Sequence, residues 1–323
     1  MSLINYIVHL EAGKVTLKQV QMPPRKAGFA LLRMLTAGIC NTDLELQRGY
    51  YGFVGTPGHE FVAEVVEADT KELIGKRVGG EINLACAHCE WCKKHLGRHC
   101  PNRTVLGIVG HQGAFAEYLT LPEENLHVIP DSIPTDHAVF LEPVAAACEI
   151  LDQVAIPGDS QVAVLGDGKL GLLISQVLQA CGLKVHQFGR HKEKLAIAEK
   201  MGVVTEIVTG EYPKAAYQWV VDATGSADGL KIAIEMAVPR GVVIMKSTVY
   251  GDCAIDTASI IVNELTLVGS RCGRFEAAME ILKLNAIDVE SMISDRMPLS
   301  RAPEAFERAA QKGVLKVLLY PGN

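Results

Sequence analysis

Four cysteines stand close together in a short segment that is rich in charged residues. They are Cys86, Cys89, Cys92 and Cys100. Their spacing fits four thiolates around one tetrahedral Zn²⁺. The segment has few apolar side chains with which to fix its own loop, and zinc binding contributes about 10–16 kcal/mol in small zinc peptides. We therefore predict a lobe over about residues 84–103 that is held by a structural zinc ion.

Disulfide bonds between these cysteines are the alternative. Disulfides persist in oxidising compartments. The chain starts with Met-Ser-Leu-Ile-Asn-Tyr, which lacks the basic and apolar segments of a secretory signal peptide. This start favours zinc over disulfides, and it leads us to expect a cytoplasmic protein.

Length and charge restrict the class of protein. A chain of 323 residues is long for one hydrophobic core, so two domains are expected. No apolar run reaches the ~18–20 residues that a membrane helix needs. The net charge is −6, and the only basic cluster is Gly189-Arg190-His191-Lys192. We expect a small-molecule substrate and neither nucleic acid nor a membrane as partner.

The predicted secondary-structure pattern changes near residue 131. Up to that point, short β-rich segments are separated by glycine and proline, which predicts a β-barrel-like domain. From residue 135 onward helical and strand patterns alternate, which predicts a parallel sheet with helices on both faces. The predicted strands of this second part are 161–165, 184–188, 219–222, 242–246 and 265–268.

A G-x-G-x-x-G motif follows the first of these strands and opens a helix. Gly166 permits the tight turn, Gly168 lets the backbone approach a pyrophosphate, and Gly171 brings the helix close to the strand. The pyrophosphate would lie at the helix N-terminus, beside Lys169 and Leu170. Asp167 would repel it unless its carboxylate faces solvent, and Lys169 could offset part of this repulsion. The alternative is a glycine-rich turn without a ligand.

The end of the second strand indicates which nucleotide is favoured. NAD sites place Asp or Glu there, roughly 20 residues after the glycines, to bind the ribose hydroxyls. Here the strand ends in Gly189-Arg190-His191-Lys192, without an acid, and Arg190 could stack on adenine or pair with a 2′-phosphate. We therefore predict NADP(H) in preference to NAD(H), the alternative being a solvated helix start. Thr224 and Ser247, which follow later strands, are expected to line the cofactor.

A second set of metal-ligand residues lies outside the cysteine lobe. It comprises Cys40 in Gly-Ile-Cys-Asn-Thr-Asp, His59 in Gly-His-Glu, and Glu142 in Leu-Glu-Pro. Each is ordinary alone. Together they supply a thiolate, an imidazole and a carboxylate, a set that leaves a fourth position open in catalytic zinc sites. Cys148 is the competing thiol, but it falls inside the following helix and we expect it in the core.

The order of these motifs resembles the zinc-dependent medium-chain dehydrogenase/reductase superfamily, which includes alcohol, polyol, threonine and glucose dehydrogenases. The resemblance implies an α/β protein with a GroES-like catalytic domain over residues 1–145 and 272–323. A Rossmann NAD(P)-binding domain with a doubly wound parallel sheet would span 146–271. It also implies two zinc ions per chain, one of them in the cleft between the domains.

The resemblance further implies roles for single residues. Cys40 and His59 would bind the catalytic zinc, with Glu142 as third ligand or close alternate. Glu60 binds or lies just behind the metal in polyol-type relatives. Ethanol-type enzymes carry cysteine at the position of Glu142, so polyol, threonine or glucose dehydrogenases are the better guide. Relatives are dimers or tetramers joined at the edge of the Rossmann sheet, for which 265–268 is a candidate strand.

Zinc in such a site lowers the pKa of a bound hydroxyl group. Thr42 would pass the proton toward the nicotinamide ribose, because a hydroxyl can donate and accept hydrogen bonds. A hydride would then move from the substrate carbon to the nicotinamide ring. We predict a zinc-dependent, NADP(H)-preferring oxidoreductase acting on a secondary alcohol, polyol or sugar. The alternatives are a zinc-independent quinone or enoyl reductase, and a nucleotide-binding relative without turnover.

Overall fold

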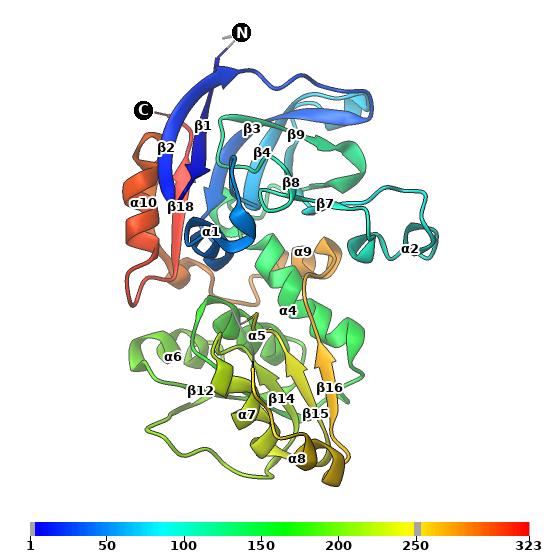
Figure 1. Ribbon diagram of the computed structural model, residues 1–323, viewed down its shortest axis with the longest axis vertical. Coiled ribbons are helices and arrows are strands. Elements are labelled where there is room, and N and C mark those ends of the chain that lie inside the picture. Colours follow the sequence, from blue (N-terminus) through cyan, green and yellow to red (C-terminus); the bar gives the residue numbers. More distant parts are fainter. Residues whose placement is uncertain (1–3, 249–252, 323) are drawn as a thin grey trace. The chain divides into compact units, whose positions relative to one another are not determined.

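The structure is a computed structural model that describes residues 4–248 and 253–322 (Figure 1). The described parts of 1–142 and 293–323 form one compact unit, and those of 143–292 form another. Each unit is described by itself. Residues 1–3 belong to the segment in which we expected no signal peptide, and they lie outside the described residues. In the described part of the chain, no helix is both long and apolar enough to cross a membrane.

Among the described residues, the first unit contains a seven-stranded sheet in the order β10-β5-β4-β3-β18-β17, with β9 also paired to β3. Its strands are β3 (Phe29–Gly38), β4 (Glu60–Glu67), β5 (Arg77–Gly80), β9 (Tyr118–Pro122), β10 (Leu126–Val128), β17 (Ile293–Pro298) and β18 (Lys316–Tyr320). The strands β1 (Ile4–Glu11) and β2 (Lys14–Gln21) form an antiparallel hairpin. This unit is the expected β-rich, GroES-like domain.

The helix α10 (Ala302–Ala309) packs against β18 and β2 of the first unit (Figure 1). Its buried side chains recur with the period of one helix face, at Ala302, Ala305, Phe306 and Ala309. Phe306 meets Phe115 edge to face, with ring centroids 5.9 Å apart, inside the hydrophobic core. The last part of the chain therefore completes the core of the first domain.

Strand pairing brings distant segments to one place in this sheet. Gly38, the last residue of β3, pairs with Glu60 on one side and with Leu318 on the other. A side chain at Gly38 would have no room, because its Cβ would lie 3.0 Å from both Glu60 Oε2 and the Cδ of Lys316. The ends of β3, β4 and β18 thus converge on the segment that carries Cys40.

The second unit is a six-stranded parallel sheet within the described residues, in the order β13-β12-β11-β14-β15-β16 (Figure 1). Its strands are β11 (Gln161–Leu165), β12 (Lys184–Gly189), β13 (Val204–Ile207), β14 (Tyr217–Asp222), β15 (Ala237–Met245) and β16 (Thr266–Gly269). In chain order this is 3-2-1-4-5-6, the Rossmann arrangement. The structure confirms the doubly wound parallel sheet, and it places β16 at an edge.

The helices of this unit connect successive strands. They are α5 (Lys169–Ala180), α6 (Lys192–Glu199) and α7 (Ala227–Met236). The crossovers through α5 and α6 run toward β13, whereas the crossover through α7 runs the opposite way. Because such connections are right-handed, helices reached in opposite directions cover opposite faces of the sheet.

The chain returns to the first unit later than we expected. Residues 272–292, which we assigned to the catalytic domain, belong to the second unit. They include α9 (Phe275–Lys283), and the preceding Arg274 forms an ion pair of 3.3 Å with Asp152 of α4 (Leu141–Gln153). Farther on, Asp288 N donates to Gln176 Oε1 over 2.7 Å. These contacts hold the segment against Rossmann helices, and the return begins at Ile293.

Candidate metal centres and dinucleotide site

The four cysteines of the lobe converge on one point. Their sulfur atoms are separated by 3.5 Å (Cys89–Cys92 and Cys86–Cys100), 3.7 Å (Cys89–Cys100) and 4.0 Å (Cys86–Cys92). A tetrahedral site with Zn–S bonds of about 2.3 Å separates its sulfurs by about 3.8 Å. A disulfide would bring two of them to about 2.05 Å. The arrangement fits a metal.

The protonation of the lobe also fits a cation. A backbone hydrogen bond from His88 lowers the pKa of Cys86 to about 6, while desolvation and the neighbouring thiols raise the pKa of Cys92 to about 12. Four thiolates this close repel one another, so they ionise together only when a positive charge lies between them. The short helix α2 (Glu90–Lys93) begins between Cys89 and Cys92 and sets their separation.

A second cluster forms where the strands of the first sheet converge. The ligand atoms of Cys40, His59 and Glu60 lie within 4.8 Å of one another. His59 is 3% exposed and Glu60 is 1% exposed. Glu142, the second residue of α4, is not among the residues that meet this distance. The structure therefore brings together three of the four predicted residues, with Glu60 rather than Glu142 as the adjacent carboxylate.

Asp43 organises this cluster, although sequence reasoning did not assign it a role. Its carboxylate accepts hydrogen bonds from Cys40 N over 2.8 Å and Gly58 N over 3.1 Å. Asp43 Oδ1 also lies 3.5 Å from His59 Nδ1. Burial lowers the pKa of His59, but the negative charges of Asp43 and Cys40 outweigh it and leave that pKa well above its ordinary value. An acid behind one ring nitrogen leaves the other nitrogen for a metal.

Lys316 is the second residue that the sequence did not reveal. Its Nζ contacts Glu60 Oε2, and it is 2% exposed. Burial lowers the pKa of Lys316, but the charges of Glu60 and Cys40 more than offset this, so the pKa is raised. Asp43 could have been suspected because it lies in the Cys40 motif. No local pattern points to Lys316, which reaches Glu60 only through the pairing of β18.

Two further residues considered in the sequence analysis are Thr42, the expected proton acceptor, and Cys148, the alternative thiol ligand. Thr42 stands in the first turn of α1 (Asn41–Gln47), with its Oγ1 3.9 Å from Cys40 Sγ. Cys148 is buried inside α4, and burial raises the pKa of its thiol to about 12. A thiol that resists ionisation in this way is a poor metal ligand, which agrees with the core position expected for it.

The glycine turn has the geometry of a dinucleotide site. Gly166 has φ +110°, and a Cβ there would lie 2.6 Å from Ala223 O. A Cβ on Gly171 would lie 2.4 Å from Gly166 O, whereas a Cβ on Gly168 would meet nothing within 4 Å. The first and third glycines are thus required by the fold, and the second leaves open space. The helix α5 begins at Lys169 and Leu170, as predicted.

The carboxylate of Asp167 does not face solvent. It is 8% exposed, and its Oδ2 accepts hydrogen bonds from Arg190 N (2.7 Å), His191 N (2.7 Å) and His191 Nδ1 (2.9 Å). Burial raises the pKa of Asp167, but these donors outweigh burial and lower it. An acid does therefore lie at the end of β12. It comes from the glycine turn and not from the strand itself.

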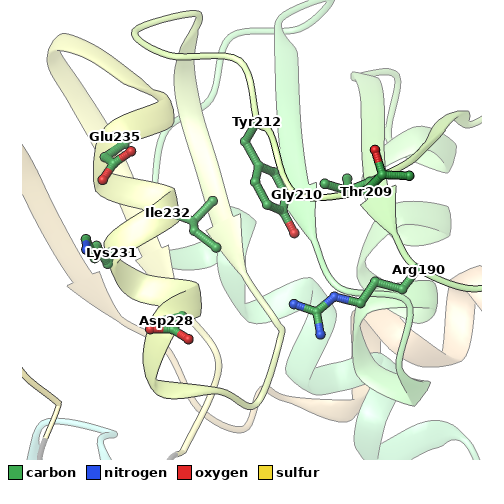
Figure 2. A pocket seen from close by; sticks show the side chains of 9 residues that line it. Arg190, Thr209, Gly210, Tyr212, Asp228, Lys231, Ile232 and Glu235 are labelled. Atoms are coloured by element: carbon green, nitrogen blue, oxygen red, sulfur yellow. The ribbon is translucent and has the colours of Figure 1, made fainter.

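Arg190 lines a cavity of about 460 Å³. Figure 2 shows its guanidinium group directed into this space, with Tyr212 on the same side and α7 opposite. The cavity is lined by Arg190, Val208, Thr209, Gly210, Tyr212, Asp228, Lys231, Ile232 and Glu235. A planar cation beside an aromatic ring is suited to bind a phosphate or a base.

The remaining predicted cofactor residues lie at the carboxyl end of the parallel sheet. Thr224 donates its hydroxyl to Asp222 Oδ1 over 2.8 Å, just after β14. Ser247 follows β15, and its Oγ accepts from Gly225 N over 2.8 Å. Ligands bind at this edge in open parallel sheets.

Comparisons with known protein families agree with both units. Residues 26–131 match the family described as alcohol dehydrogenase GroES-like domain, and residues 170–286 match the family described as zinc-binding dehydrogenase. The chain is 28% identical to a D-arabitol-phosphate dehydrogenase of Enterococcus avium, over 93% of this chain and 92% of that one. It is 29% identical to an erythritol/L-threitol dehydrogenase of Mycolicibacterium smegmatis, over 94% of each.

Solved structures show the same fold over almost the whole length. An alcohol dehydrogenase from Thermus sp. ATN1 is 29% identical, with a TM-score of 0.90 over 98% of this chain and 100% of that one. A protein from Sinorhizobium meliloti 1021, described as a zinc-binding dehydrogenase and bound to NADP, is also 29% identical. Its TM-score is 0.90 over 99% of this chain and 100% of that one. The chain belongs to the zinc-dependent, alcohol and polyol dehydrogenase-like medium-chain dehydrogenase/reductases, and it is a zinc-containing, NAD(P)-dependent dehydrogenase of alcohols.

Proposed function

We propose that this protein oxidises a secondary alcohol, polyol or sugar at a catalytic zinc, reversibly and with NADP(H) preferred over NAD(H). The observation that carries the proposal is the buried cluster of Cys40, His59 and Glu60, whose ligand atoms lie within 4.8 Å of one another. A thiolate, an imidazole and a carboxylate are the ligand types of catalytic zinc sites.

The residues of the cluster would divide the work as follows. Cys40 and His59 bind the metal, and Asp43 fixes the imidazole through its second nitrogen. The third ligand is a carboxylate, supplied by Glu60 or Glu142. Zinc bound here would stabilise the alkoxide form of a substrate hydroxyl. Thr42, whose hydroxyl lies 3.9 Å from Cys40 Sγ, accepts the proton and passes it on.

The choice of NADP(H) rests on Arg190. Its guanidinium group enters the cavity beside Tyr212, where it can pair with a 2′-phosphate (Figure 2). The glycine turn holds the pyrophosphate, with Lys169 and Leu170 at the start of the helix, and Gly189, Thr224 and Ser247 line the rest of the dinucleotide.

The polyol class is supported by the relatives. Those reported above include enzymes named for arabitol phosphate, erythritol and threitol. In addition, the chain carries Glu142 where ethanol-type enzymes carry cysteine. We therefore expect polyols and sugar alcohols to be better substrates than ethanol.

Assembly and location belong to the same proposal. The edge strand β16 follows α8 (Thr257–Val262), on which Ile261 is 73% exposed and Val262 is 79% exposed. These features support a homodimer or homotetramer, which light scattering would test. Four cysteine sulfurs at zinc spacing suit a reducing compartment, and this supports a cytoplasmic location.

Metal analysis tests the proposal directly. We expect two zinc ions per chain in the purified protein and one in Cys40→Ser. Zinc content should also differ between Glu60→Gln and Glu142→Gln, because the variant that removes the third ligand loses the catalytic zinc. Oxidation of polyols with NADP⁺ should disappear in Cys40→Ser. A single zinc ion per wild-type chain that is retained in Cys40→Ser would contradict the catalytic zinc site and favour the zinc-independent reductase. Two zinc ions without turnover on any alcohol would instead indicate a nucleotide-binding relative.

A further inference from the structure

The carboxylate of Asp167 bridges two segments that both surround the proposed nucleotide site. It belongs to the glycine turn, and its Oδ2 receives the backbone N–H groups of Arg190 and His191 over 2.7 Å each. His191 Nδ1 adds a third contact of 2.9 Å. Three donors on one oxygen stabilise the negative charge of this carboxylate, and hydrogen bonds to a charged group are among the strong ones.

The same carboxylate occupies the space beside Gly189. A Cβ on Gly189 would lie 2.7 Å from Asp167 Cβ, 2.8 Å from Asp167 Oδ2 and 2.9 Å from Leu195 Cδ2. All three distances are shorter than a van der Waals contact between such atoms, and two of them involve Asp167. Position 189 is the end of β12, where NAD sites usually carry the acid that binds the ribose hydroxyls. With Asp167 in place, the strand end has no room for that acid.

The bridge also fixes the backbone from which the Arg190 side chain extends. Because its backbone N–H is held by Asp167, the backbone at the start of the Arg190 side chain is fixed, and the guanidinium group enters the cavity beside Tyr212 (Figure 2). The cavity carries charges of both signs, Arg190 and Lys231 against Asp228 and Glu235. A small displacement of Arg190 would therefore change which of these groups a bound phosphate meets.

We propose that Asp167 is a positioning residue for nucleotide choice: it holds Arg190 toward the 2′-phosphate and excludes a ribose-binding acid from position 189. The inference rests on the proposed preference for NADP(H). Asp167 and Gly189 thus act as a pair, because the Asp167 side chain fits only when residue 189 has no side chain.

Binding measurements test the positioning role without relying on turnover. Titration calorimetry would give the Kd of NADP⁺ and of NAD⁺ for the wild type, Asp167→Ala, Asp167→Asn and Arg190→Ala, each with its zinc content verified. Loss of one charged hydrogen-bond acceptor should raise the Kd of NADP⁺ about tenfold in Asp167→Ala and leave NAD⁺ within about twofold. Asp167→Asn should lie nearer the wild type, because its amide oxygen still accepts from both backbone N–H groups.

The control variant Arg190→Ala separates the positioning role of Asp167 from the proposed preference for NADP(H). If Arg190→Ala lowers the preference for NADP⁺ and Asp167→Ala does not, the positioning role is overturned while the proposed function stands. Equal weakening of both nucleotides in Asp167→Ala overturns it as well, because that is the result of a merely structural residue. If Arg190→Ala leaves the preference unchanged, the proposed function fails at this point and the inference falls with it.

Thermal unfolding without nucleotide tests the exclusion. Gly189→Ala should lower the Tm in the wild-type background and have a smaller effect when combined with Asp167→Gly, where only the end of the Leu195 side chain remains close. Gly158→Ala, where a Cβ would meet nothing within 4 Å, is the matched control. The pair Asp167→Gly/Gly189→Asp should then shift the preference toward NAD⁺ by about tenfold or more. Equal destabilisation by Gly189→Ala in both backgrounds, or an unchanged preference in the pair, would contradict the exclusion.

Discussion

Lys316 and Glu60 form a buried ion pair although 256 positions separate them in the sequence. Lys316 is the first residue of β18 and Glu60 is the first residue of β4, and both strands pair with β3 at Gly38. The pair lies directly beside Cys40 and His59. Because both side chains are at most 2% exposed, each is the charge that compensates the other.

Removing one member of this pair should be strongly destabilising. Lys316→Met leaves the Glu60 carboxylate buried without its cation, which costs about 3–5 kcal/mol of the free energy of unfolding. Urea denaturation in a Cys40→Ser background, where no catalytic zinc supplies Glu60 with a second cation, measures this loss. Lys312→Met, at an exposed position of the same segment, should change the stability by less than about 0.5 kcal/mol. The combination Lys316→Met/Glu60→Gln should recover part of the loss; no recovery would argue against a dominant charge effect.

The two proposed zinc sites should differ in what they contribute to the fold. Cys100 is fully buried, so Cys100→Ser should release the structural zinc, lower the Tm and expose the lobe to proteolysis. Cys40→Ser should release only the other zinc and leave the lobe resistant. Zinc content measured together with limited proteolysis distinguishes them. Proteolysis of the lobe in Cys40→Ser but not in Cys100→Ser would reverse the assignment.

Substitution of two glycines of the same motif should have opposite effects, one on stability and the other on nucleotide binding. A Cβ at position 171 would lie 2.4 Å from the carbonyl oxygen of Gly166, so Gly171→Ala should lower the Tm before any nucleotide is added. A Cβ at position 168 meets nothing within 4 Å, so Gly168→Ala should unfold like the wild type. It should nevertheless weaken NADP⁺ binding, because its methyl group occupies the space that a pyrophosphate needs. Tm and Kd measured in parallel separate the two effects.

The ionisation of Asp167 should appear in the pH dependence of stability. Its pKa is lowered in the folded protein. The carboxylate therefore contributes stability above its unfolded pKa of about 3.9, and this contribution is lost as the pH falls through the lower folded value. Wild type should exceed Asp167→Asn in Tm near pH 7, and the difference should shrink steadily below about pH 4. A difference that stays constant down to about pH 3 would show that the charge is not what matters.

Much of this molecule follows from patterns that are local in the sequence. The convergence of the four lobe cysteines was predictable because they lie in one short segment, where spacing alone decides whether they can surround a metal. The glycine turn was predictable because strand, turn and helix are consecutive, and the backbone sterics of Gly166 and Gly171 act within that unit. The alternation of strands and helices likewise gave the parallel sheet.

Tertiary structure decided which distant charges meet. Lys316 reaches Glu60 through strand pairing, Asp167 reaches the end of β12 from another turn, and residues 272–292 pack with the Rossmann helices. A charged side chain gives no local signal of its partner, because the partner is fixed by sheet order and register over the whole chain. The sequence by itself therefore determined the fold and the types of ligand, while only the tertiary structure decided which carboxylate stands beside Cys40 and His59.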